Sequence, residues 1–169
     1  MGLDFTAVFQ KPLKFEKRID TEFTPFSRAC SNFFYSNYYG DDSTLEELGN
    51  YLKIGLEYLI EPNLHDFTID EMQLEFAVGE MREKLLAEQN ELDQNSHKAW
   101  KDISTYLINL NATIKALKES TKLSELQLNN GNWFTYIQSG GFTEDLEKLR
   151  KLLNEAKEDG MDKFTFKLY

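Results

Sequence analysis

The stretch WKDISTYLINLNATIKAL, residues 100–117, carries the most regular hydrophobic pattern in the chain. Its apolar side chains recur at alternating spacings of three and four residues. Residues three and four apart lie on the same face of an α-helix, so this spacing predicts one long helix over about residues 97–119. The apolar positions are Trp100, Ile103, Leu107, Leu110, Ile114 and Leu117. Such a pattern indicates how a helix packs and names no substrate.

A second long helix is predicted immediately upstream. Thr68 and Glu71 have the spacing of a capping box, in which two side chains satisfy free backbone N–H groups at a helix start. Strong helix formers follow up to about Asp93, and Ser96 can then cap the next helix. The two helices are expected to fold back on each other as a long antiparallel hairpin. The apolar positions of the upstream helix are Ile69, Met72, Phe76, Met81, Leu85, Leu86 and Leu92.

The formal net charge of −10 is unevenly distributed along the chain. Residues 66–93 hold nine acidic and two basic residues, a net charge of −7, whereas residues 98–122 carry a net charge of +3. An acidic helix is therefore expected beside a basic one. Because an exposed ion pair contributes only ~0.2–1 kcal/mol, this attraction favours an orientation more than it stabilises the fold. The acidity suits either solubility or an acidic face for a basic partner protein.

Composition argues against several classes of protein. Binding of nucleic acid through a basic patch requires clustered Lys and Arg, which this acidic chain lacks. The longest apolar runs are only a few residues, so no membrane interaction through a spanning helix is expected. No signal peptide is expected, and the single Cys30 cannot close an intramolecular disulfide. These features together predict a cytoplasmic protein.

Alternating residues near the two ends of the chain predict β-strands. Residues 3–10 and 163–168 both alternate apolar and polar side chains, and the two strands are expected to share one sheet. The intervening segments are expected as strand or helix over 13–39, one helix or two over 43–59, a β-hairpin over 126–136 and a last helix over 143–160. Residues 1–169 thus predict a single α+β domain, in which a small, mainly antiparallel sheet including both terminal strands packs with the long helical hairpin and additional helices.

No group of residues in the sequence marks a catalytic site. Neither His65 nor His97 has a second histidine at metal-ligand spacing, so both are expected to be surface or capping residues. Cys30 lies in no recognised nucleophile motif and is expected in the core. Residues 129–132 and 139–141 lack the patterns of a P-loop or a dinucleotide-binding loop. No metal and no cofactor is therefore expected.

The best candidate for binding is the aromatic run from Phe33 to Tyr39. Five aromatic residues in seven positions cannot all face one core, so some are expected on the surface, where Tyr is enriched in protein interfaces. The alternative is a core strand with a wrapped corner. Aspartates next to this run can instead serve only the turn that they occupy. The predicted protein-binding residues are Tyr35, Tyr38, Tyr39, Asp41 and Asp42 here, and Glu75, Glu80 and Glu83 on the acidic helix.

The N-terminal third of the chain carries a short motif. It opens with Met1-Gly2-Leu3-Asp4-Phe5-Thr6 and continues with Ser27-Arg28 and Ser31-Asn32-Phe33. This motif resembles a family of small uncharacterised bacterial and phage proteins that begin Met-Gly-Leu-Asp. The resemblance implies a bacterial or phage cytosol and carries over no activity. A candidate polar site follows from Asp4, Arg28 and Asn32, because polar groups beside a buried strand need partners.

Two functions from different classes remain open at this point. The first is a non-catalytic, acidic protein-interaction module, such as an immunity or inhibitor protein in bacterial or phage conflict, whose partner is another, basic protein. The second is a small-molecule-binding protein or enzyme with a non-local site near Asp4, Arg28 and Cys30. A cleft that contains these three residues would favour the second function. An open acidic face with exposed tyrosines would favour the first.

Overall fold

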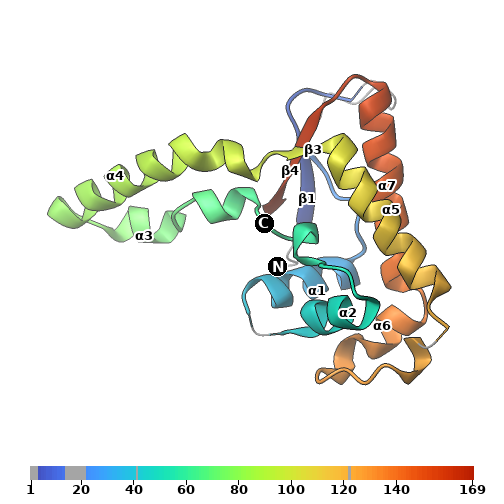
Figure 1. Cartoon of the computed structure of the whole chain (residues 1–169). Coiled ribbons are helices and arrows are strands. Elements are labelled where there is room, and N and C mark those ends of the chain that lie inside the picture. The colour runs from blue at the N-terminus through green and yellow to red at the C-terminus, as the bar shows by residue number, and fades with distance from the viewer. Residues whose placement is uncertain (1–3, 14–21, 41, 122) are drawn as a thin grey trace.

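A computed structural model of the chain describes residues 4–13, 22–40, 42–121 and 123–169. Within this part of the chain, a four-stranded antiparallel sheet has the order β2-β1-β4-β3. Its strands are β1 (Phe5–Phe9), β2 (Glu22–Phe23), β3 (Lys101–Asp102) and β4 (Lys163–Leu168). Helices pack around this sheet, and a long arm projects away from it (Figure 1). The predicted α+β class, with a strand from near each terminus in one sheet, is confirmed.

The two central strands form the middle of the hydrophobic core. β1 and β4 pair over their whole length, from Phe5 opposite Leu168 to Phe9 opposite Phe164. Phe5, Ala7, Phe9, Phe164 and Phe166 are buried, Leu168 is half-buried, and the rings of Phe5 and Phe166 lie 4.8 Å apart. Period-two alternation places these aromatic side chains on one face of the sheet, where helices cover them.

Two short helices follow strands β1 and β2 in the chain. Helix α1 (Arg28–Tyr38) begins after Ser27, whose Oγ accepts a hydrogen bond from the Cys30 N–H at 3.2 Å, so the segment left open between strand and helix holds both β2 and α1. Helix α2 (Thr44–Leu52) is followed by the 3₁₀ turn η1 (Glu57–Leu59). The alternative of two short helices is therefore confirmed. A side chain at Gly49 would meet the carbonyl oxygen of Ile54 at 2.8 Å, so this helix packs closely against the chain that leaves it.

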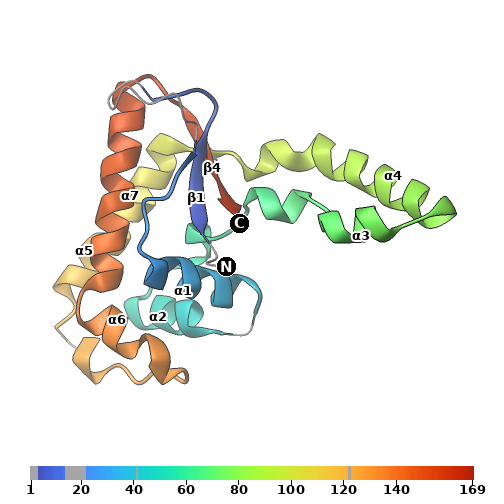
Figure 2. The ribbon, with the colours of Figure 1, turned by 180° about the vertical axis from the view of Figure 1, so that it is seen from behind.

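The long antiparallel helix pair is made from different helices than the sequence predicts. Helix α5 (Ile103–Glu119) lies beside α7 (Gly141–Glu158) in both views (Figures 1 and 2). Leu107 and Leu110 are buried as predicted. The predicted packing of α5 against the upstream helix is wrong, because that helix points away from the body.

The predicted helix boundaries on either side of residue 100 are also corrected. The segment before α5 is a 3₁₀ turn, η3 (Ser96–Ala99), followed by strand β3. Asp102 then starts α5, because its Oδ1 accepts a hydrogen bond from the Thr105 N–H at 2.7 Å. Pairing of Lys101 with Phe164 in the sheet competes with helix formation here, so Trp100 lies outside the helix whose pattern it extends.

The predicted helix over residues 68–93 is two helices. They are α3 (Glu71–Phe76) and α4 (Gly79–Asn95), and the 3₁₀ turn η2 (Leu64–Phe67) precedes them. Asp70, and not Thr68, caps α3 by accepting a hydrogen bond from the Met72 N–H at 2.9 Å. Extended backbone at Val78 and a positive φ of 58° at Gly79 reverse the chain, which glycine permits and most side chains oppose.

The predicted β-hairpin over residues 126–136 is wrong. This region holds the 3₁₀ turns η4 (Leu123–Glu125) and η5 (Gly131–Trp133) and helix α6 (Phe134–Gln138). The Asn130 side chain accepts a hydrogen bond from the Asn132 N–H at 3.0 Å, which starts η5. Asparagine-rich turn chemistry therefore initiates a helical turn here and not a two-residue hairpin loop.

Candidate functional site

Residues 68–95, which we call the arm, stand away from the rest of the molecule (Figures 1 and 2). The arm contains α3, the turn at Val78 and Gly79, and α4. The 17 residues of α4 span ~26 Å at the usual helical rise. All residues of α3 and α4 are described, and none of them is buried.

The arm has its own internal contacts. The Gln89 side-chain oxygen accepts a hydrogen bond from the Ile69 N–H at 2.9 Å, and the Gln89 amide donates to Asp93 Oδ1 at 2.6 Å. Leu74 on α3 and Leu85 on α4 are half-buried, and the two helices contact each other. One polar bridge and a thin apolar seam therefore hold the arm in one conformation.

Several large apolar side chains of the arm are exposed to solvent. Phe76 is 76% exposed and Val78 is 79% exposed. The full set on the arm comprises Met72, Phe76, Val78, Met81 and Leu86. The prediction that the arm's apolar stripe packs on the basic helix is wrong, because the arm projects away from the body (Figure 1) and these side chains are exposed.

The arm also carries the acidic face that the sequence predicts. Glu75, Glu80 and Glu83 are all exposed on it, within the segment whose net charge is −7. The expected pairing of this face with the basic stretch does not occur, since lysines of α5 pair elsewhere. Lys118 forms an ion pair with Glu147 on α7, and Lys115 lies 3.9 Å from Glu119.

A cluster of rings lies where the arm joins the body. This root cluster consists of Tyr35 and Tyr38 from α1, Tyr39 at the C-terminal cap of that helix, and His65 from η2. The Tyr39 hydroxyl lies 2.8 Å from His65 Nε2, and the Tyr38 hydroxyl donates to Asp66. Burial raises the pKa of both Tyr38 and Tyr39, so their hydroxyls remain protonated at neutral pH. Phe33 and Phe34 belong instead to the core, which divides the aromatic run between interior and surface.

Asp42 is a structural hydrogen-bond acceptor between distant segments. It accepts from the Thr44 N–H at 2.9 Å, from Asn130 Nδ2 at 2.9 Å and from the Trp133 indole N–H. Burial alone would raise the pKa of Asp42, but these hydrogen bonds outweigh it and lower the pKa. This supports the turn-forming interpretation of Asp42. Asp41 lies outside the described residues.

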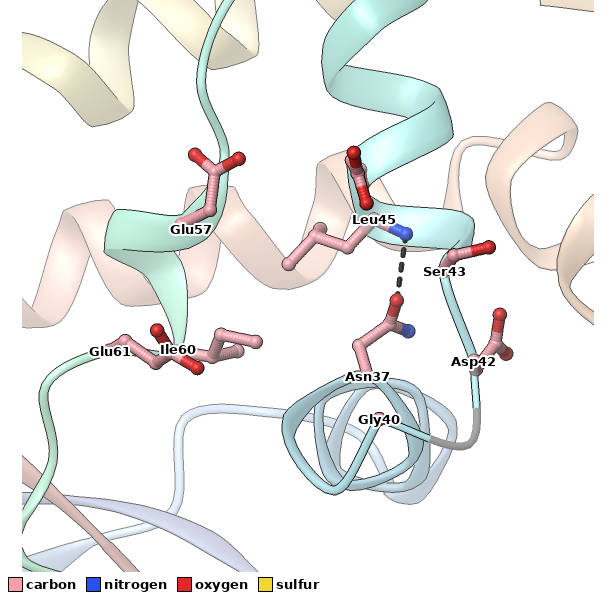
Figure 3. Close-up of a pocket in the computed structure, with 9 residues that line it drawn as sticks. Asn37, Gly40, Asp42, Ser43, Leu45, Glu57, Ile60 and Glu61 are labelled. Carbon is pink, nitrogen blue, oxygen red and sulfur yellow. Dashed lines mark hydrogen bonds between the residues drawn. The ribbon is translucent and has the colours of Figure 1, made fainter. Parts of the chain in front are cut away.

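A recess of about 280 Å³ lies between the end of α1, the start of α2 and η1 (Figure 3). Leu45 and Ile60 supply apolar side chains, and the exposed carboxylates of Glu46, Glu57 and Glu61 stand around them. Asn37 Oδ1 accepts a hydrogen bond from the Leu45 N–H at 2.8 Å, which fixes one wall. The lining of the recess is acidic, and the Ser43 hydroxyl at its edge donates a hydrogen bond to Glu47 Oε1 at 3.0 Å. Its full lining is Asn37, Gly40, Asp42, Ser43, Leu45, Glu46, Glu57, Ile60 and Glu61.

The residues of the predicted polar site do not surround a cleft. Asp4, Arg28 and Asn32 are exposed, and Asp4 pairs through its backbone with Tyr169. Cys30 is fully buried on the opposite side of α1, and burial raises the pKa of its thiol well above the ordinary value. A thiol held protonated is a poor nucleophile, so this arrangement does not favour nucleophilic chemistry at Cys30.

The described residues contain no group of three or more His, Cys, Asp or Glu side chains that could hold a metal ion. In the same part of the chain, no helix has both the length and the apolar character to cross a bilayer. Comparison with protein-family models, with curated proteins and with solved structures gave no match. The resemblance of the N-terminal motif therefore stays a prediction, and function has to be inferred from the molecule's own surfaces.

Proposed function

We propose that this protein is a non-catalytic interaction module that docks onto a basic partner protein through its acidic arm. One observation carries the proposal: an ordered pair of helices projects from the body and exposes both acidic and large apolar side chains. An arm that contributes nothing to the core is retained at a cost in solubility, so a contact with another molecule explains it better than folding does.

The charge of the arm selects the class of partner. The arm's net charge of −6 repels the phosphates of nucleic acids and attracts clustered Lys and Arg. Such attraction acts mainly on the rate of association and on the choice of partner. An immunity or inhibitor protein of bacterial or phage conflict, working in the cytoplasm, fits this chemistry, because an acidic arm can occupy a basic surface that would otherwise bind an anionic substrate.

The test is kinetic and needs a purified partner, obtained by affinity capture from the source organism with mass spectrometry. Association and dissociation rates are then measured at increasing salt concentration. The association rate should fall with salt, because charges are screened beyond ~8 Å at physiological ionic strength. Reversal of Glu75, Glu80 and Glu83 to Lys should reproduce that fall without lowering the melting temperature much, since all three side chains are exposed.

A matched control variant distinguishes an effect of the arm from an effect of the overall net charge. Glu125, Glu144 and Glu158 are exposed acids of the body, and their reversal to Lys changes the net charge by the same amount. The control variant should retain most of the wild-type association rate. Equal losses in both triple variants would mean that only overall charge matters and would overturn docking through the arm.

The root cluster is proposed as a second contact of the same partner. Tyr39 is 46% exposed, and its ring packs 4.5 Å from that of Tyr35. Replacement of Tyr39 by Ala should accelerate dissociation more than it slows association, because a buried aromatic anchor acts after the encounter. A dissociation rate equal to that of the wild type would remove the root cluster from the interface and leave the arm.

A further inference from the structure

We infer that the end of the arm is a hydrophobic anchor, which enters an apolar groove on the partner protein whose rim carries Lys and Arg. We call this anchor the tip and define it as Met72, Phe76, Val78 and Met81. The inference rests on the proposed function and adds the chemistry of the surface that receives the arm.

The tip gathers four of the eight large apolar side chains that are exposed in the described part of the chain. Its four members are between 60% and 79% exposed. Met72 and Phe76 are four residues apart on α3 and so share a face, and Val78 and Met81 follow directly across the turn. Elsewhere the large exposed apolar side chains come from separate elements, as Ile108 on α5 and Tyr169 at the chain end do. Contiguous apolar side chains on a projecting element are typical of a binding surface.

The conformation of the tip is fixed before any partner arrives. Asp70 caps α3, Gln89 bonds the chain just before it, and the positive φ of Gly79 sets the reversal between the helices. Binding through a preformed element loses less conformational freedom than the ordering of a loose segment does. The tip is therefore suited to act as an anchor and not as a tether.

Acidic side chains surround the tip and determine the rim of the groove. Glu71, Glu75, Glu80 and Glu83 are exposed beside it, with Arg82 as the nearest basic residue in sequence. A groove rimmed by carboxylates would place like charges together and oppose binding. A groove rimmed by Lys and Arg would pair with these acids while its apolar floor covers Phe76 and its neighbours.

The net charge of the arm also argues against a membrane or a second copy of this chain as the binding partner of the tip. The cytoplasmic face of a membrane is anionic and repels an arm of net charge −6. A second copy of the arm would bring the same charge against it. Within the basic stretch of a second copy, Lys118 already pairs with Glu147, Lys115 lies 3.9 Å from Glu119, and Lys101 donates to the Pro62 carbonyl. A different protein with a basic rim is the occupant that remains.

The experiment uses the full-length chain, immobilised, and a random peptide library displayed on phage as the probe. Selection on the wild type should enrich peptides that combine aromatic or aliphatic residues with Lys and Arg. The double variant Phe76→Ser with Met81→Ser should weaken the binding of these peptides by roughly tenfold or more, mainly through faster dissociation. Ile108→Ser makes the same kind of change on α5, at a side chain that is 69% exposed, and should leave binding unchanged.

The outcomes separate this inference from the proposed function. If the selected peptides are basic but lack apolar residues, and bind the double variant as well as the wild type, the anchor is overturned while docking on a basic partner stands. Failure to enrich basic peptides at all overturns both. A dimer in light scattering, or co-sedimentation with anionic vesicles, that is lost in the double variant overturns the anchor in favour of a second copy or a membrane. Circular dichroism verifies folding, and Val78→Ser replaces the double variant if that variant unfolds.

Discussion

The side-chain oxygen of Gln89 accepts a hydrogen bond from the backbone N–H of Ile69 at 2.9 Å, which joins the two sides of the arm. This contact lies outside the hydrophobic core, whose members belong to the sheet and to the helices that cover it. Elements with few buried apolar contacts open locally, at a lower free energy than global unfolding requires. The arm and the body should therefore respond differently to the same mutation.

Replacement of Gln89 by Ala should loosen the arm and spare the body. Hydrogen–deuterium exchange is expected to become faster over residues 68–76, because the Ile69 N–H loses its acceptor and α3 loses its tie to α4. The midpoint of urea unfolding should change little. Gln73→Ala is the control, since Gln73 is exposed on α3 and is itself a helix position that Ala suits. Unchanged exchange in the Gln89 variant would show that the apolar seam alone orders the arm.

Replacement of Leu110 by Ala should destabilise the body. Leu110 is fully buried on α5, the helix that packs beside α7, and a cavity at such a site costs about 2–5 kcal/mol of unfolding free energy. Urea unfolding followed by circular dichroism measures the loss. Ile108→Ala, on the exposed side of the same helix, should stay within about 0.5 kcal/mol of the wild type. Similar losses in the two variants would contradict the assigned buried face.

The spacing of apolar residues around Leu110 shows what hydrophobic periodicity can and cannot predict. Spacings of three and four residues identify the buried face of α5, and Leu107, Leu110 and Ile114 are all buried on it. The same spacings cannot identify the covering element, because any apolar helix face satisfies them. The covering helix is α7, which follows α5 only after an intervening stretch of short helical turns, and not the helix next to it in sequence.

The predicted packing of the arm is wrong for the same reason: the spacing of apolar residues does not show whether another element covers them. Ile69, Met72 and Phe76 have the spacings of three and four residues that are typical of a core stripe, yet Met72 and Phe76 are exposed. A signal for the correct structure is present in the dipeptide Val78-Gly79, because a β-branched residue followed by glycine interrupts a helical pattern. The sequence carries no comparable signal for the contacts that form the candidate site. Asp42 meets Trp133 across 91 residues, and Tyr39 meets His65 across 26, so only the folded chain brings them together.

Removal of residues 162–169 should abolish cooperative folding. These residues include β4, which lies between β1 and β3 in the sheet, and they supply the buried Phe164 and Phe166. The truncated chain would expose an unpaired edge of β1 together with core aromatic side chains, so aggregation is expected. Light scattering and thermal unfolding measure the effect. A soluble truncation with a sharp unfolding transition would mean that the sheet forms without its central strand.

Asp145 links three helices through its hydrogen bonds. We therefore expect the unfolding free energy of the body to depend on pH. Its carboxylate is buried and accepts hydrogen bonds from the Ser27 N–H at 3.0 Å, from the Tyr136 hydroxyl at 2.8 Å and from Lys148 Nζ at 3.0 Å. Burial alone would raise the pKa of Asp145. The hydrogen bonds, which favour the charged form, outweigh burial and lower it.

The sign of the pH dependence follows from this lowered pKa. The unfolded chain takes up a proton at Asp145 at a higher pH than the folded chain does, near the ordinary value of about 3.9. The carboxylate therefore contributes stability that is fully present above that pH and is lost as the pH falls through the folded pKa. Asp145→Asn should lower the unfolding free energy by about 1–3 kcal/mol at pH 7, because an amide replaces a charged acceptor. Below about pH 4 the difference from the wild type should shrink. Urea unfolding of both chains between pH 7 and pH 3 checks this, and a constant difference over the whole range would contradict the assigned role.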